Sequence, residues 1–121
     1  MTATLPATGV DRFVAELAAQ GLKPTRHGGL IVYSVTPLNG VVAGREIETG
    51  VDVSELAGWP MTGPHWIHVP NILTIPGGSQ QASEHPEWSR YSRPHPGRLD
   101  ASSAPGRAWV AHVRALLGTA T

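Results

Sequence analysis

The amino-acid sequence predicts an α+β fold, with a helix at each end of the chain and an antiparallel strand meander between them. Apolar residues recur at helical spacing in two segments, 10–20 and 108–117. Between these segments, runs rich in Val and Ile are separated by turns rich in Gly and Pro. Because helical and strand-like segments are segregated rather than alternating, we expect both helices to pack on one face of an antiparallel sheet.

The chain has the length of one domain, and we expect a single domain over residues 1–121 with an ordered core from about 10 to 118. The nine basic and nine acidic residues cancel, which makes nucleic acid an unlikely partner, since nucleic-acid-binding domains carry a basic surface. The absence of cysteine excludes disulfides and thiolate chemistry. The sequence starts without signal-peptide features and contains no apolar run of membrane-spanning length, so we expect a soluble, cytoplasmic protein without membrane contact.

The two helices are predicted by amphipathic spacing and by their end signals. The first is expected at Val10–Gln20, where Gly21 provides a natural stop. The second is expected at Ala108–Leu117, with Pro105 near its start and Gly118 at its end. The side chains that we expect to be buried against the sheet are Phe13, Leu17, Ile31, Val110 and Leu117.

The strands are predicted from β-branched runs bounded by turns. Leu30–Val35 is one strand, and Asn39-Gly40 after it is a strong hairpin signal. The hairpin partner is expected at Val41–Val53, where polar and apolar residues alternate. Trp66–Val69 is predicted as a short strand inside a proline-rich loop, and Asn71–Ile75 as a last short strand.

The segment Gln80–Ala104 shows no clear period and is expected to be irregular. A long irregular segment in a compact domain is often functional. It mixes arginine with aromatic side chains, a combination that can bind a protein tail or RNA, because guanidinium groups pair with carboxylates and aromatic rings stack. The expected binding residues are Trp88, Arg90, Tyr91 and Arg93, together with Trp59 in the preceding proline-rich loop.

The candidate catalytic residues are His85 and His95, in the same irregular segment. The residue types of a serine hydrolase, serine, histidine and aspartate, are also present in this segment. They are Ser83, Ser89, Ser92, His85 and Asp100. The sequence lacks the Gly-x-Ser-x-Gly motif that usually marks such a nucleophile. His65 and His68 are three residues apart, so in a strand they point to opposite faces and do not form a metal pair. We therefore expect no metal and no cofactor.

The order of elements and several short motifs resemble the ubiquitin-conjugating (UBC) fold of bacterial conjugation systems. That family has a Tyr-Pro-x-x-Pro-Pro segment after its third strand, and Gly58–Pro64 contains a similar Trp-Pro-x-x-x-Pro pattern. The family's His-Pro-Asn tripeptide is matched at two of three positions by His85–Glu87. The segments His65–Pro70, Trp88–Arg90 and Trp109–Arg114 are also similar to bacterial UBC-like proteins.

The resemblance extends over residues 10–117, but the catalytic cysteine of the family is missing. Counting from the tripeptide places that cysteine near His95, and the family's asparagine is replaced by Glu87. Without a thiolate the chain cannot carry a modifier as a thioester, and a carboxylate would repel developing negative charge. The resemblance thus implies a non-catalytic adaptor that binds a ubiquitin-like protein or its activating enzyme.

Two other functions are consistent with the sequence. The first is a small hydrolase or a metal-assisted enzyme that uses His85 and His95. The second is an RNA-binding module that uses the arginine and aromatic residues of the segment Trp88–Arg98.

Overall fold

The computed structural model describes residues 8–76, 79–83, 85–93 and 104–121. The helices of this part of the chain are α1 (Val10–Ala19), the short 3-10 helix η1 (Val53–Glu55) and α2 (Pro105–Leu117). The strands are β1 (Thr25–His27), β2 (Leu30–Val35), β3 (Ile47–Asp52), β4 (Ile67–Pro70), β5 (Ser79–Ala82) and β6 (Trp88–Ser92). None of these helices of the described ranges is long and apolar enough to cross a membrane.

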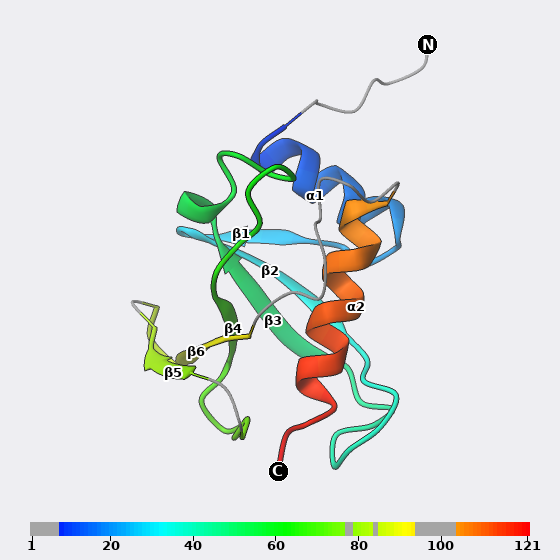
Figure 1. Ribbon diagram of the computed structural model, residues 1–121, viewed down its shortest axis with the longest axis vertical. Helices are drawn as coiled ribbons and strands as arrows, with labels where there is room; N and C mark the ends of the chain where they lie inside the picture. Colours follow the sequence, from blue (N-terminus) through cyan, green and yellow to red (C-terminus); the bar gives the residue numbers. More distant parts are fainter. Residues whose placement is uncertain (1–7, 77–78, 84, 94–103) are drawn as a thin grey trace.

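The strands form one antiparallel sheet with the helices α1 and α2 packed against it (Figure 1), which confirms the predicted α+β fold. The strand order is β1-β2-β3-β4-β6-β5. The first four strands are a meander, and β2, β3 and β4 lie within or overlap segments that were predicted as strands. The last two depart from it, because β6 lies between β4 and β5 and pairs with both.

The sheet opens between β3 and β4. These strands pair at a single position, where Gly50 lies opposite His68. In the same register Glu48 lies opposite Pro70, whose nitrogen has no hydrogen to donate, so the ladder cannot continue there. The hydroxyl of Thr49 donates instead to the carbonyl oxygen of His68 at 2.9 Å. The strands therefore separate beyond this point.

The core lies between the helices and the sheet and is centred on aromatic rings. Phe13 contacts Trp59 edge-on at 4.9 Å between ring centroids, and Trp59 contacts Trp109 in the same way at 6.3 Å. The indole nitrogen of Trp109 donates to the Tyr33 hydroxyl at 2.8 Å, and burial raises the pKa of Tyr33. The five residues predicted to be buried are all in this core, which confirms that prediction: Phe13, Leu17, Ile31, Val110 and Leu117.

Glu16 connects three parts of the fold through its carboxylate. Its Oε1 accepts hydrogen bonds from Trp59 Nε1 and Arg12 Nε, both at 2.9 Å. Its Oε2 accepts from the backbone N–H of Gly106 in the first turn of α2 at 2.8 Å. That N–H has no partner within its own helix. The negative charge of Glu16 also lies at the positive end of the α2 dipole, where it is stabilising.

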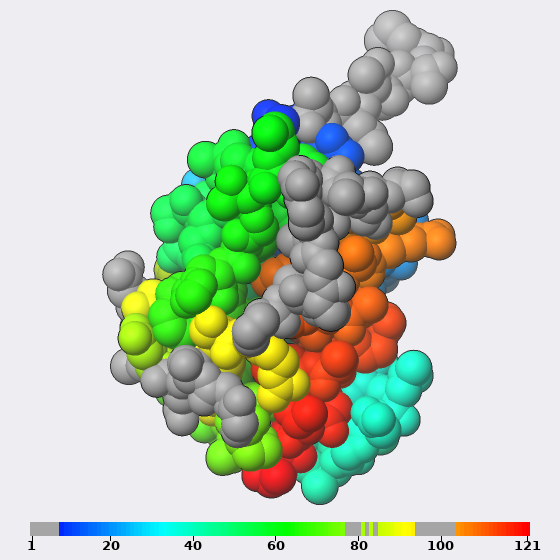
Figure 2. Space-filling view, in the orientation of Figure 1, coloured from blue at the N-terminus to red at the C-terminus, as the bar shows by residue number. Residues whose placement is uncertain are grey.

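The predicted hairpin at Asn39-Gly40 is wrong. The strand expected at Val41–Val53 begins only at Ile47, and residues 36–46 form a loop that turns back on itself. Its Val42 is buried in the core, so tertiary packing recruits this apolar residue without strand pairing. The loop lies beside the C-terminal end of α2 (Figure 2). Its Gly40 approaches Gly118 there.

Other strand predictions are corrected as well. Asn71–Ile75 forms no strand, since it turns directly after β4 with Leu73 N–H donating to Pro70 O. The segment Gln80–Ala104 is not irregular throughout, because β5 and β6 pair within its first half. The sequence analysis also missed β1, a three-residue edge strand with exposed side chains.

Candidate functional site

The two faces of the sheet differ in what covers them. Successive side chains of a strand point to opposite faces. One face carries the core residues that contact α1 and α2. The other face carries the alternate residues of the central strands: Glu48, Gly50, Asp52, His68, Pro70, Trp88 and Arg90. We name two of the hollows on this second face the groove and the histidine pocket.

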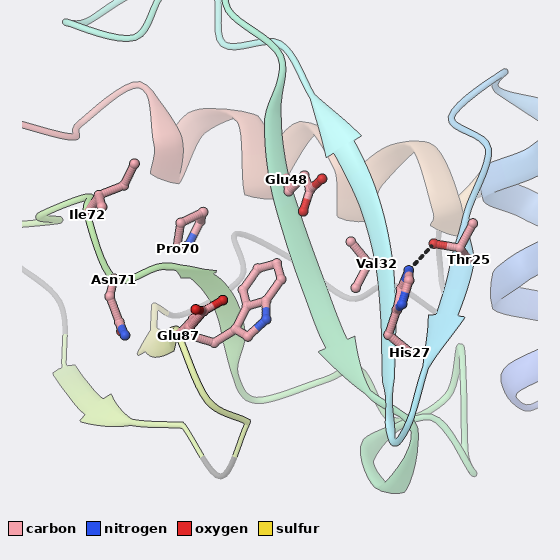
Figure 3. Close-up of a pocket in the computed structure, with 9 residues that line it drawn as sticks. Thr25, His27, Val32, Glu48, Pro70, Asn71, Ile72 and Glu87 are labelled. Carbon is pink, nitrogen blue, oxygen red and sulfur yellow. Dashed lines mark hydrogen bonds between the residues drawn. The ribbon is translucent and has the colours of Figure 1, made fainter.

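The groove has a volume of about 670 Å³ and lies where β3 and β4 separate. Its lining residues are Thr25, His27, Val32, Glu48, Pro70, Asn71, Ile72, Glu87 and Trp88. Figure 3 shows Thr25, His27, Val32 and Glu48 along one side and Pro70 to Ile72 along the other. The side chain of Ile72 is 89% exposed, although it is a large apolar residue.

The charge of the groove is negative. The carboxylates of Glu48 and Glu87 line it, and none of its lining residues is lysine or arginine. The apolar part of the lining is formed by Val32, Pro70, Ile72 and Trp88. The groove therefore combines an apolar floor with acidic groups, and it favours a partner that presents apolar groups next to basic ones.

The histidine pocket lies next to the Gly50–His68 pairing and has a volume of about 220 Å³. Its lining residues are Asp52, Ser54, Glu55, Trp66, His68 and Arg90. Arg90 is the cross-strand neighbour of His68. Its guanidinium carbon lies 4.5 Å from the centroid of the Trp66 ring, and its Nη2 donates to Gln81 at 2.8 Å.

Two histidines meet at one end of the histidine pocket. His68 Nδ1 forms a hydrogen bond of 3.2 Å with the Ser83 hydroxyl, and the same hydroxyl accepts the backbone N–H of His85 at 3.0 Å. His85 Nε2 donates to Asp52 Oδ2 at 2.9 Å. The two imidazole rings lie 5.6 Å apart between centroids, edge to face.

Burial and neighbouring charges shift three pKa values in this pocket. Burial, with His85 nearby, lowers the pKa of His68 to about 4. Burial acts to raise the pKa of Asp52, but the hydrogen bonds from His85 and Ser54 outweigh it and leave that pKa below its ordinary value. Burial raises the pKa of Glu55, although backbone N–H groups such as that of His65 oppose the effect.

The contacts do not assemble a serine hydrolase triad. A triad needs one imidazole between the nucleophile and the acid. Here Ser83 contacts His68 while Asp52 contacts His85, so the groups form two separate pairs. The described ranges also contain no group of three His, Asp or Glu side chains placed to hold a metal ion. His95 and Asp100 lie outside the described residues.

The predicted binding residues are not brought together on one surface. Trp88 is half-buried and lines the groove, and Arg90 lines the histidine pocket. Tyr91 is 1% exposed and Trp59 is 0% exposed, so the prediction that these two rings form a binding surface is wrong. Tyr91 faces the core because it alternates with Arg90 along β6, and Trp59 packs edge-on between the rings of Phe13 and Trp109.

Arg93 lies away from both hollows. Its Nη2 donates to the carbonyl oxygen of Pro76 at 3.3 Å and to the Thr119 hydroxyl at 3.4 Å, beyond the end of α2. It therefore shares no site with Arg90, although only two residues separate them. Arg90 is in the middle of β6, whereas Arg93 follows the last residue of that strand.

The sequence analysis missed Asp52, Glu55, His68 and Ile72 as site residues. For His68 a signal existed, because a histidine between Ile67 and Val69 in a strand points away from the apolar face. The others depend on contacts between distant segments. No protein-family model, no curated protein and no solved structure matches this chain.

Proposed function

We propose that this chain is a non-catalytic adaptor of UBC type that binds a ubiquitin-like protein or its activating enzyme. The observation that carries the proposal is the groove, which places an exposed isoleucine, a half-buried tryptophan and two carboxylates on the sheet face opposite the helices. An apolar centre with a polar rim is the usual anatomy of a protein interface. The UBC-type identity and the kind of partner are inferred from the sequence motifs.

The composition of the groove favours a protein over nucleic acid. Glu48 and Glu87 would repel phosphates, and no lysine or arginine is among the lining residues. Trp88 offers the side-chain type that most often carries binding energy in protein interfaces. The expected partner surface is an apolar patch flanked by lysine or arginine.

The proposal of a non-catalytic role is based on the chemistry that is missing. The chain has no thiol to accept a modifier. The third position of the His-Pro-Glu tripeptide, Glu87, has a positive φ of 71° and lines the groove. The imidazole of His85 is engaged by Asp52. These residues are therefore better suited to holding the turn before β6 than to stabilising an oxyanion.

Binding can be tested with purified ubiquitin-like proteins and their activating enzymes. Ile72→Asp places a charge in the groove at an exposed position, so the fold should be unchanged while affinity falls by about tenfold or more. Leu38→Asp is the matched control, because Leu38 is 82% exposed and lies outside the groove. Equal affinity of both variants for the partner would exclude the groove as the binding site.

A hydrolase that uses His85 is the alternative, and the hydrogen bond from His85 to Asp52 favours it. Its test is labelling of Ser83 by a fluorophosphonate, with Ser83→Ala as the control. Labelling that needs both Ser83 and His85 would support an enzyme. If the folded protein is not labelled while Ile72→Asp loses a partner, the adaptor function is supported instead.

A further inference from the structure

The groove contains two carboxylates without partners. Glu48 lies on β3 and Glu87 in the turn before β6, and Figure 3 shows them on the two sides of the groove. Both residues are exposed, so a ligand can reach their side chains. Within the part of the chain that the structure describes, neither carboxylate takes part in an ion pair or a hydrogen bond. The groove therefore presents negative charge that the fold itself leaves without a counter-charge.

A tryptophan ring lines the same groove. In the strand registers Pro70 pairs with Trp88, and Glu48 lies opposite Pro70. These three residues therefore form a row across β3, β4 and β6, with their side chains on one face of the sheet. Trp88 is half-buried, so part of its side chain packs against the sheet and part stays accessible. The row places an accessible aromatic surface on the face that carries the Glu48 carboxylate.

The neighbouring histidine pocket shows which group fits such a set of side chains. It is lined by one tryptophan and two carboxylates, which are Trp66, Asp52 and Glu55. An arginine of the chain itself completes this set, because the guanidinium carbon of Arg90 lies 4.5 Å from the centroid of the Trp66 ring. The groove repeats the combination of one tryptophan and two carboxylates, but none of its lining residues is arginine or lysine. It therefore lacks the cation that the histidine pocket contains.

We propose that the groove binds an arginine side chain of the partner protein. The guanidinium group stacks on the Trp88 ring and pairs with the carboxylates of Glu48 and Glu87. The methylene groups of the arginine pack on the apolar lining residues Pro70 and Ile72. Lysine fits less well, because its ammonium group is not planar and is more strongly hydrated. The inference rests on the proposed function in that the groove is the binding surface, and it adds the group that the partner must present.

The test is an NMR titration of the full chain with three end-blocked tripeptides, in which arginine, lysine or citrulline stands between two leucines. The arginine peptide is expected to shift the indole resonance of Trp88 and the amide resonances of Glu48 and Glu87. Its affinity should be about threefold or more above that of the lysine peptide, which has the charge without the plane. It should be about tenfold or more above that of the citrulline peptide, which has the shape without the charge. Equal affinity for the three peptides, or shifts confined to other residues, would overturn the proposal.

Two variants separate a specific site from a general attraction to an acidic surface. Glu48→Gln removes a carboxylate of the groove and should weaken binding of the arginine peptide by about threefold or more. Glu46→Gln removes the same charge from an exposed position that does not line the groove, and should change this affinity by less than about twofold. Equal weakening by both variants would mean that the attraction is nonspecific and would overturn the proposal.

Trp88→Leu tests the stacking. Leucine keeps an apolar side chain but has no ring, so the preference for the arginine peptide over the lysine peptide should disappear. A folded variant that keeps this preference would refute the stacking, and if the variant does not fold, the preference of the unmodified protein and the Glu48→Gln result decide the question. If a ubiquitin-like partner binds but the arginine peptide does not, the proposed function stands and this inference is wrong. If the peptide binds and no such partner does, the reverse holds.

Discussion

Acidification should destabilise this protein through His68 before most carboxylates are protonated. The imidazole is 2% exposed and lies among charged or titratable groups on three sides: His85, Asp52 and Arg90. Burial is the largest cause of its low pKa, and the neighbouring His85 and Arg90 act in the same direction while Asp52 opposes them. Native His68 therefore stays neutral at a pH where the unfolded chain binds a proton.

The sign and size of the effect follow from the two pKa values of His68. Its pKa falls from 6.5 to about 4 on folding, so between these values the unfolded state binds more protons and stability decreases as pH falls. Each pH unit in this window changes the free energy of unfolding by at most about 1.4 kcal/mol. The loss between pH 7 and pH 5 is therefore up to about 2 kcal/mol, and solvent screening reduces it.

The assay is urea unfolding at pH 7 and pH 5 for the unmodified protein and for His68→Gln. Glutamine cannot titrate, so the variant keeps the contributions of the other histidines and loses only that of His68. The unmodified protein is expected to lose about 1 to 2 kcal/mol more than the variant on acidification. Equal losses would refute the reasoning. If His68→Gln does not fold, an NMR titration of the ring, with a midpoint near 4 expected, provides the same test.

Two further predictions concern stability at neutral pH. Glu16→Ala should lower the free energy of unfolding by about 3 kcal/mol, because it leaves the indole N–H of Trp59 and the N–H of Gly106 without their charged acceptor. Calorimetry measures this loss, and a value under about 1 kcal/mol would contradict the prediction. Gly40→Ala should destabilise the loop 36–46, because φ at Gly40 is +85° and a Cβ there would collide with the carbonyl of Gly118. Gly44→Ala has a similar φ but open space around it, so the difference in melting temperature between the two variants isolates the collision.

The sequence by itself determined the two helices, the strand β2 and the residues that fill the core. Phe13 and Leu17 of α1, like Val110 and Leu117 of α2, are spaced so that a helix must place them on one side. The strand Leu30–Val35 is predicted by β-branched residues between turns. These signals are local, because the repeat of apolar residues depends only on the geometry of a single element.

Only the tertiary structure decided the extent of β3 and the presence of β5 and β6. Val41 and Val42 have strand propensity, yet their loop turns and places Val42 in the core next to α2. The strand Ser79–Ala82 has weak propensity and exists through its pairing with β6. Strand pairing is a contact between segments, so intrinsic preferences of residues predict it poorly.

The candidate site depended most on the tertiary structure. His85 could be named from the sequence, but its partner Asp52 is 33 positions away, at the end of β3. Glu55, His68 and Arg90 line one pocket because Gly50 pairs with His68 and His68 pairs with Arg90. A shift of one residue in either register would turn the side chain of His68 or Arg90 to the opposite face of the sheet. The sequence supplies the groups, and the strand registers determine which of them meet.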